Sequence, residues 1–204
     1  MSDFAPVVLE GRHVRLEPLA REHRADLAVV ALDPDLWRFT LTQIHSLDDL
    51  DAYIEEALAG QRGGTALPFA TVNRATGRAI GSTRFGNIDT RNRHVEIGWS
   101  WLGREFHRQA FNTEAKLLML GHAFERMECI RVEFRVNAPN ARSRRAVVRL
   151  GAQMEGILRQ HTIRSDGQRI DWVYYSILRG EWPEVRARLE HRLAVHAQST
   201  NVVS

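Results

Sequence analysis

A short segment between a predicted strand and a predicted helix carries residue types that could bind an anion. It runs from Trp101 to Ala115 and contains Arg104 and Arg108 before a helix that we expect to open at Asn112. The first turn of a helix has unpaired backbone N–H groups and the positive end of the helix dipole, which suit a phosphate. Arginines can add charge-assisted hydrogen bonds. Because Asn112 is also an ordinary N-cap residue, the segment alone fits a phosphate site or a plain helix start.

The other reactive side chains favour no separate chemistry. Cys129 is the only cysteine, which excludes an internal disulfide and a cysteine-cluster metal site. With no histidine beside it in the sequence, we expect it to be a buried apolar residue and not a nucleophile. The nine histidines show no metal-binding spacing. We therefore predict no metal site.

The elements that must position these residues alternate between helical and strand-like patterns. Period-two alternation between turn residues predicts strands at 13–19, 67–72, 79–85, 93–102, 129–136, 154–163 and 169–178. Apolar residues at helical spacing predict helices at 22–31, 112–126, 140–150 and 184–195, and a further helix capped by Ser46 and ended by Gly60. We expect the last helix to pack on its own domain instead of on a membrane or partner.

Glu96 lies on the strand that precedes the anion-binding segment. Strict alternation gives this strand one apolar face, made of Val95, Ile97, Trp99 and Trp101. Glu96, Gly98 and Ser100 would then share the opposite face. We therefore expect Glu96 to point away from the aromatic side chains, either as a solvated or ion-paired residue or as a functional carboxylate.

Composition indicates an ordinary globular chain. With 204 residues, 44% hydrophobic and 26% charged, it can form a single domain over 1–204, with a core at about 9–178, a C-terminal helix at about 181–195 and a frayed tail at 196–204. It contains no apolar run of membrane-spanning length, and Met1 to Pro6 does not read as a secretion signal, so we expect a cytoplasmic protein. The net charge of +3 is small, and Lys116 is the sole lysine among 28 basic residues. This arginine bias carries little weight as a nucleic-acid signal.

Several stretches along the chain resemble the GNAT superfamily of acyl-CoA-dependent N-acyltransferases. Within that superfamily the sequence is most similar to the branch containing the ribosomal-protein N-terminal (alanine/serine) acetyltransferases. The matching stretches, spread over roughly residues 9 to 190, are Leu9–Leu19, Val95–Trp99, Asn112–Ala115, His122–Glu125, Asn140–Ser143, Arg149–Ala152, Glu155–Gly156, Arg159 and Glu181–Pro183.

The resemblance implies both a fold and a reaction. The fold is α+β, with a central, mostly antiparallel twisted sheet of about seven strands, splayed between the fourth (93–102) and fifth (129–136), flanked by helices and followed by a C-terminal helix. The reaction is transfer of an acetyl group from acetyl-CoA to a primary amine by direct attack in a ternary complex. The acceptor would be a protein N-terminus, an amino-sugar antibiotic, a polyamine or an amino acid, among which the sequence does not choose.

The resemblance also implies which residues hold the cofactor. The pyrophosphate would lie on His107, Arg108, Gln109, Ala110, Phe111, Asn112 and Thr113. The pantetheine would bond to the backbone of Ser100, Trp101 and Leu102, with Asn140 and Ser143 near the sulfur. His107, Ala110 and Asn112 depart from the superfamily's loop pattern, and the methyl of Ala110 replaces a glycine that permits close approach to phosphate. These departures put cofactor affinity in question.

For catalysis, the resemblance implies a carboxylate that accepts the proton of the attacking amine, and Glu96 matches that position. Many superfamily members place a tyrosine acid where this chain has Val147. The branch suggests Ser143 as the proton donor to the leaving thiolate, although a serine in the first turn of a helix commonly bonds to the backbone.

Two other classes of function remain open at this point. One is a catalytically impaired acyl-CoA-binding protein that acts through interaction, which the altered loop and the missing tyrosine motivate. The other is nucleic-acid binding, which lacks clustered aromatic residues and a recognisable module, so we expect none. Homodimers are common in the branch, but the residues do not predict one.

Overall fold

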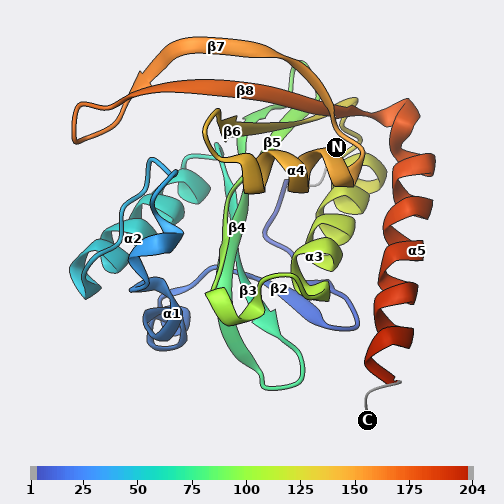
Figure 1. Ribbon diagram of the computed structural model, residues 1–204, viewed down its shortest axis with the longest axis horizontal. Helices are drawn as coiled ribbons and strands as arrows, with labels where there is room; N and C mark the ends of the chain where they lie inside the picture. Colours follow the sequence, from blue (N-terminus) through green and yellow to red (C-terminus); the bar gives the residue numbers. More distant parts are fainter. Residues whose placement is uncertain (1–3, 202–204) are drawn as a thin grey trace.

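The structure is a computed structural model that describes residues 4–201, and one eight-stranded sheet forms its centre (Figure 1). Neighbouring strands follow the order β1-β2-β3-β4-β5-β6-β8-β7, and every pair is antiparallel except β5 with β6. The strands are β1 (Leu9–Glu10), β2 (Val14–Pro18), β3 (Leu67–Asn73), β4 (Arg78–Asp89), β5 (His94–Leu102), β6 (Arg131–Asn137), β7 (Gln153–Ile163) and β8 (Arg169–Leu178). The expected α+β fold is therefore confirmed, with β1 as a short additional strand.

Helices cover both faces of the sheet. In Figure 1 α1 and α2 lie on one side, and α3 and α5 lie side by side on the other. The helices are α1 (Arg24–Ala31), α2 (Leu47–Arg62), α3 (Ala110–Gly121), α4 (Ala141–Leu150) and α5 (Trp182–Asn201). As expected, α5 packs on its own fold, against α3. No helix within residues 4–201 is long and apolar enough to cross a membrane.

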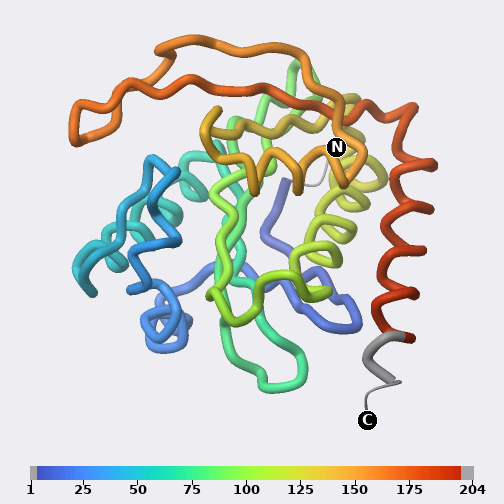
Figure 2. Tube along the Cα trace, in the orientation of Figure 1, coloured from blue at the N-terminus to red at the C-terminus, as the bar shows by residue number. Residues whose placement is uncertain are grey.

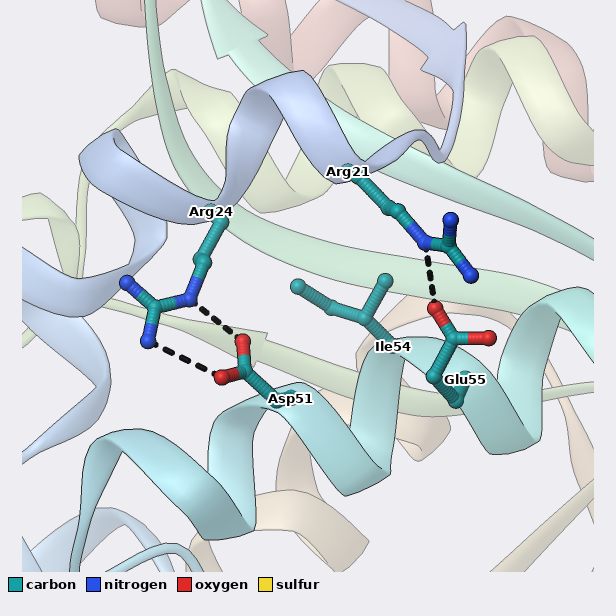
Figure 3. A pocket seen from close by; sticks show the side chains of 5 residues that line it. All are labelled: Arg21, Arg24, Asp51, Ile54 and Glu55. Atoms are coloured by element: carbon teal, nitrogen blue, oxygen red, sulfur yellow. Dashed lines mark hydrogen bonds and ion pairs between the residues drawn. The ribbon is translucent and has the colours of Figure 1, made fainter.

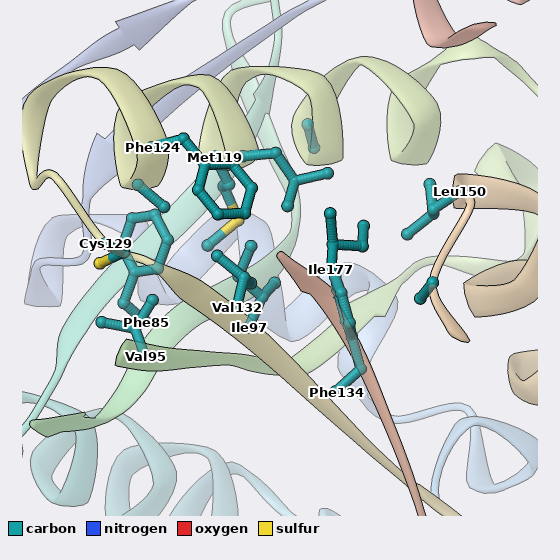
Figure 4. Packing of buried hydrophobic residues seen from close by; sticks show 14 of the residues in the cluster. Phe85, Val95, Ile97, Met119, Phe124, Cys129, Val132, Phe134, Leu150 and Ile177 are labelled. Carbon is teal, nitrogen blue, oxygen red and sulfur yellow. The ribbon is translucent and has the colours of Figure 1, made fainter. Parts of the chain in front are cut away.

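Two apolar clusters fix these layers. The first lies between the sheet and α3, where Phe85, Val95, Ile97, Met119, Phe124 and Ile177 are packed together (Figure 4). Cys129 belongs to this cluster and is fully buried, as expected. The second lies between the opposite face and α1 and α2, around Trp37 and Tyr53. Each large side chain buried in this way contributes about 1.5–3 kcal/mol, so the clusters hold the strands' faces in place.

Two helix ends differ from the sequence prediction. The helix α3 begins at Ala110 instead of Asn112, because Gln109 takes the N-cap position with extended backbone angles and lets the helix start directly after it. Asn112 therefore lies inside the first turn. The helix α5 continues to Asn201, so it includes 196–201 of the tail that we expected to be frayed. Residues 202–204 of that tail lie outside the described residues.

A bulge in β5 changes which side chains share a face. Ser82 pairs with Trp101 and Arg84 with Gly98, so the single residue between them on β4 opposes Trp99 and Ser100. Trp99 adopts a left-handed conformation with φ of 50°. An extra residue of this kind shifts the alternation of the strand by one. The predicted alternation is therefore wrong after Gly98.

The side chains confirm the exchange of faces. Val95 and Ile97 lie in the first cluster, whereas Trp101 belongs to the second, with its ring centroid 5.2 Å from that of Trp37. Ser100 faces α3, where its Oγ lies 2.6 Å from Lys116 Nζ. The aromatic rings of Trp99 and Trp101 thus lie on the face of Glu96, contrary to the expectation from simple alternation.

The strands β5 and β6 separate shortly after they pair. Their parallel register covers only His94–Glu96 against Arg131–Glu133, although both strands continue well beyond it. Throughout its length β6 pairs with β8 on its other side. This confirms the expected splay and leaves the edge of β5 beyond Glu96 without a neighbouring strand.

The hairpin of β7 and β8 lies along one end of the sheet, with its tip on the side that carries α1 and α2 (Figure 2). The tip contacts the segment between α1 and α2 through a hydrogen bond of 3.3 Å from Arg164 Nη1 to the carbonyl of Arg38. At the end of β6, Asn137 Nδ2 donates to the carbonyl of Phe39 at 3.1 Å. The segment between α1 and α2 is thereby held beside the mouth of the β5–β6 splay.

Candidate active site

Glu96 is the last residue of β5 that pairs with β6, and it is 4% exposed. Asn87 Nδ2 donates to its Oε2 at 2.6 Å, and Arg135 Nη2 lies 2.6 Å from the same oxygen. Burial raises the pKa of Glu96 above its usual value, and the contacts with Arg135 and Asn87 only partly offset this. Within residues 4–201, Oε1 accepts no hydrogen bond, and it is not among the fully enclosed unpaired atoms. One oxygen is thus held while the other stays open.

Two glycines make room for this arrangement. A methyl group on Gly98 would lie 2.9 Å from Glu96 Oε1, so a side chain there would push against the carboxylate. Gly86 pairs with Glu96 across the strands, and a methyl on it would lie 2.3 Å from the ring of Trp99. Packing therefore explains the sequence Glu96-Ile-Gly-Trp99. Its glycine leaves space for the carboxylate, and its tryptophan ring lies over Gly86 of the neighbouring strand.

Asn87 is a site residue that the sequence analysis missed. It lies at an irregularity near the end of β4 and has a φ of 46°, in the left-handed region that costs most residues energy but that asparagine tolerates. This conformation allows its amide to reach Glu96. The pair Gly86-Asn87 at the end of a strand was the available signal, since both residue types favour bulges and turns.

A buried arginine forms the wall beside Glu96. Arg84 is 3% exposed and lies across from Gly98 on the same face of the sheet. Its guanidinium lies between the rings of Tyr53 (5.1 Å) and Trp99 (4.9 Å), and Nη1 donates to Glu56 at 3.1 Å. Such stacking fixes the plane of the guanidinium.

Several hydrogen-bond donors on this face have no partner in the described part of the chain. They are Nε and Nη2 of Arg84, Nε of Arg135 and Nε1 of Trp101. A buried donor without a partner is costly, commonly about 1–3 kcal/mol. All four are donors that the protein encloses, so a ligand could reach them only if neighbouring side chains moved.

The start of α3 is suited to bind an anion, and Ala110, which replaces a glycine of the superfamily's loop pattern, does not obstruct it. The N-cap residue Gln109 makes no capping bond, since its amide turns back to the carbonyl of Glu105, so the first N–H groups of α3 receive no side-chain cap. The left-handed position of the loop is Arg108, with φ of 62°, and not Ala110. The methyl of Ala110 is packed inside, at 6% exposure. It therefore does not stand where a phosphate would approach.

Two of the basic residues in this segment have other partners. Arg104 pairs with Asp33 (Nε to Oδ2, 2.9 Å) and with Asp35, which ties the loop to the segment after α1. His107 Nε2 donates to the carbonyl of Leu102 at 2.9 Å, and Arg142 Nη1 lies 3.3 Å from its Nδ1. Burial lowers the pKa of His107, which favours the neutral ring. Because His107 occupies the carbonyl of Leu102, that group is less available to a ligand than the resemblance implied.

The remaining loop residues differ in their contacts. Phe111 packs edge-on against Phe106 at 5.6 Å and is half-buried, as is Thr113. Arg108 is exposed, and no ion pair within residues 4–201 includes it. Ser100 is exposed at the unpaired edge of β5, whereas the side chain of Trp101 is buried. The loop therefore offers Arg108 as its available cation.

The candidate acid lies on α4, across the splay from β5. Asn140 is the N-cap of this helix, and its Oδ1 accepts the N–H of Ser143 at 3.0 Å. The structure gives the hydroxyl of Ser143 no partner of its own in the described residues, and no contact there joins Ser143 to Glu96. Val147 is 9% exposed and packs in the first apolar cluster. The structure thus brings Glu96, Asn87 and Arg135 together, and keeps Ser143 apart from them.

Two hollows elsewhere on the surface do not belong to this site. One lies between α1 and α2, where Arg21 pairs with Glu55 and Arg24 with Asp51 on either side of Ile54 (Figure 3). The other is an open depression along residues 157–161 of β7. Neither shares a residue with the surroundings of Glu96. Within residues 4–201 no group of acidic, histidine and cysteine side chains is arranged to hold a metal ion.

Comparison with known proteins gives one family match and several relatives. Residues 13–153 match the sequence profile described as "Acetyltransferase (GNAT) domain". A Bacillus subtilis (strain 168) protein named "Putative ribosomal N-acetyltransferase YdaF" is 35% identical over 106 residues, which are 52% of this chain and 57% of that protein. This chain's match thus spans little more than half of that relative's length.

Solved structures share the fold. A GCN5-related N-acetyltransferase from Brucella melitensis is 28% identical, with a TM-score of 0.86 over 93% of this chain and 86% of that one. Mycobacterium smegmatis RimJ in complex with CoA-disulfide is 22% identical, with a TM-score of 0.79 over 94% of this chain and 97% of that one. At that identity the second likeness concerns the fold alone.

Proposed function

The chain belongs to the acetyltransferase (GNAT) family, and from that premise we propose that it transfers an acetyl group from acetyl-CoA to a primary amine by direct attack in a ternary complex. The observation that carries the proposal is the state of Glu96, a buried carboxylate with one oxygen fixed and one open, at the point where β5 and β6 part. A carboxylate in this state is suited to accept a proton from an ammonium or amine group.

Acetyl-CoA supplies an activated acetyl thioester, and the residues present fit its phosphates and pantetheine. The uncapped start of α3 and Arg108 would hold the pyrophosphate. The unpaired edge of β5 beyond Glu96 offers backbone groups, with Ser100 at the surface, to the pantetheine. His107 would act indirectly, by closing the end of the splay between Leu102 and α4.

The proton steps rest on Glu96 and Ser143. An amine with a pKa near 10 must lose its proton before it can attack, and Glu96 Oε1 is the atom that would accept that proton. Arg135 and Asn87 orient the carboxylate through Oε2, and both contacts favour its ionised form. The Ser143 hydroxyl, at the start of α4, would donate a proton to the leaving thiolate. The N–H of the same residue bonds to Asn140, which holds Ser143 at the start of the helix and leaves its hydroxyl to the thiolate.

The face that surrounds Glu96 bears on the acceptor. Arg135 lies beside Glu96 and is partly exposed, and its guanidinium would suit an amine that carries carbonyl or carboxylate oxygens near the nitrogen, as a protein N-terminus or an amino acid does. The name of YdaF makes a ribosomal-protein N-terminus one acceptor to test. Polyamines offer no such oxygen, and amino sugars offer hydroxyl groups instead.

Thermal unfolding with and without acetyl-CoA tests cofactor binding. A ligand at 100 times its Kd stabilises the native state by about 2.7 kcal/mol, which raises Tm by several degrees for a chain of this size. Thiol release from acetyl-CoA with peptides, amino acids, amino sugars and polyamines then tests turnover. Glu96→Gln and Ser143→Ala serve as variants. Binding without turnover of any amine would favour the alternative of an impaired acyl-CoA-binding protein, and no binding would reject both functions.

A further inference from the structure

The only lysine of the chain, Lys116, is buried beneath α3 at 6% exposure. Its Nζ donates to Ser100 Oγ at 2.6 Å and to Thr83 Oγ1 at 3.0 Å. The two hydroxyl oxygens lie 2.7 Å apart, so the three polar atoms form a closed cluster that joins α3, β4 and β5. A cluster of this kind gives the amine hydrogen bonds but no opposite charge.

The other buried charged groups on α3, β4 and β5 are engaged elsewhere. Arg84 of β4 and Glu96 of β5 lie on the opposite face of the sheet. Glu114 of α3 accepts hydrogen bonds from backbone N–H groups before and at the start of β2. Burial without a counter-ion lowers the pKa of Lys116 to about 7. The side chain therefore loses and gains its proton in the neutral pH range.

The position of the cluster relates it to the cofactor site. Ser100 reaches the surface at the unpaired edge of β5, where the pantetheine is placed in the proposed function. Long side chains on a helix point back towards its N-terminus, so Lys116 extends from the second turn of α3 towards the end that would hold the phosphates. Bound anions favour the charged form of a nearby amine, and they do so more strongly away from water.

We propose that Lys116 is a buried counter-charge for the phosphates of acetyl-CoA. Its amine takes up one proton from solvent when the phosphates bind at the start of α3, and it returns that proton when they leave. The added N–H bond converts the amine to an ammonium, and no other bond changes. This inference rests on the proposed function, since it places the cofactor at α3.

The sole lysine makes the titration directly measurable. Untagged protein labelled with ¹³Cε-lysine gives one lysine signal, which can be followed across pH alone, with acetyl-CoA, and with adenosine 3′,5′-bisphosphate. We expect the pKa of Lys116 to rise by at least about one pH unit with both ligands, which corresponds to about tenfold tighter binding to the protonated form. If the pKa of Lys116 were the same with and without bound ligand, the proposal would be overturned. A rise with acetyl-CoA alone would reject the phosphates as the cause.

A variant distinguishes proton uptake by Lys116 from proton uptake by the ligand itself. Lys116→Met keeps most of the volume and removes the buried amine, so it should fold at least as stably as the parent, and thermal unfolding checks this. Calorimetry of acetyl-CoA binding at pH 8 in buffers of different ionisation enthalpy measures proton uptake, with Met119→Leu as a matched control on α3. Because Thr83 of the cluster also contacts Met119 Sδ at 3.5 Å, Leu120→Met, a buried apolar exchange on α3, is measured as a second control. We expect the parent and this second control to take up roughly half a proton more than Lys116→Met.

The pH dependence of affinity follows with a defined sign. Because bound phosphate raises the pKa of Lys116 from about 7, the extra affinity is complete below pH 7 and is lost as the pH rises through the bound-state pKa. The parent should bind about tenfold more tightly than Lys116→Met at pH 6.5 and equally at about pH 10. Equal proton uptake in both proteins would reject the proposed role of Lys116 but would leave the proposed function in place. Absence of any binding by the parent would instead reject the proposed function.

Discussion

Two buried glutamates, Glu96 and Glu114, are 4% and 5% exposed but use their carboxylate oxygens differently. Glu114 accepts the backbone N–H of Arg12 on Oε1 (2.8 Å) and those of His13 (2.6 Å) and Val14 (2.7 Å) on Oε2. Both of its oxygens are thus used to join α3 to the start of β2. Glu96 has both of its contacts on Oε2 and leaves Oε1 open. A carboxylate with both oxygens occupied serves the fold, whereas one with an open oxygen can also serve chemistry.

The surroundings of the two carboxylates repeat this contrast. Each lies against a glycine, since a methyl on Gly11 would be 2.5 Å from Glu114 Cδ and one on Gly98 would be 2.9 Å from Glu96 Oε1. The donors differ, however. Backbone N–H groups hold Glu114, while an arginine and an asparagine in the left-handed conformation hold Glu96.

The largest expected effect is that of Glu96→Gln on turnover. An amide cannot accept the amine proton, so we expect kcat/KM to fall by about 10²- to 10⁴-fold, as is typical for loss of a general base. Steady-state thiol release with the best amine substrate measures it. The matched control is Glu133→Gln, which removes the carboxylate opposite Glu96 on β6 and should stay within a few fold. An equal loss in both variants would contradict the assignment of the base.

Glu114→Gln should show the opposite profile. Its NH₂ group would face N–H donors, so we expect the free energy of unfolding to fall by about 3 kcal/mol, with Tm lower by roughly 6–12 °C. Below the unfolding transition, turnover should change little. Thermal unfolding and initial rates on the same samples test this. Retained stability, or a large loss of turnover in fully folded protein, would break the contrast between the two carboxylates.

The two glycines sharpen the comparison at a smaller scale. Gly98→Ala should displace the Glu96 carboxylate and lower kcat/KM by roughly 10- to 100-fold, because small misplacements of catalytic groups are costly. Gly11→Ala should instead push on Glu114 and lower stability by about 1–3 kcal/mol. Unfolding curves and rates for both variants provide the test. If the two substitutions affected rate and stability in the same proportions, the separate roles would not hold.

The fold was largely predictable because its elements follow strong local patterns. The strand alternation of Val95 and Ile97, and the Ser46 cap with its apolar helix face, are set within a few residues. The separation of β5 from β6 was expected from the family resemblance and is visible in the register.

The site was only partly predictable because its details depend on long-range contacts. The bulge at Trp99 reverses the faces of Ser100 and Trp101, and local sequence does not reveal one extra residue in a strand. Asn87 and Arg135 reach Glu96 from two other strands. Their roles became visible only when those strands were placed side by side. The same holds for Gln109, whose side chain bonds to Glu105 instead of capping α3.

The smallest expected effect concerns Asn87 and appears in the pH profile. Asn87→Gly removes the amide that bonds to Glu96 Oε2, while glycine accepts the φ of 46° without strain. This hydrogen bond favours the ionised carboxylate. Burial already raises the pKa of Glu96, and loss of the bond should raise that pKa further.

Because the ionised form is the base, the acid limb of kcat/KM against pH should move to higher pH, and turnover at pH 6 should fall several-fold, recovering at higher pH. Rate profiles from pH 5 to 9 measure the shift. Asn92→Ala, in the turn that follows β4 and bonded to Asp89, should leave the limb in place. An unmoved limb in Asn87→Gly would mean that Arg135 alone sets the ionisation of Glu96, which would make its surroundings more like those of a structural carboxylate.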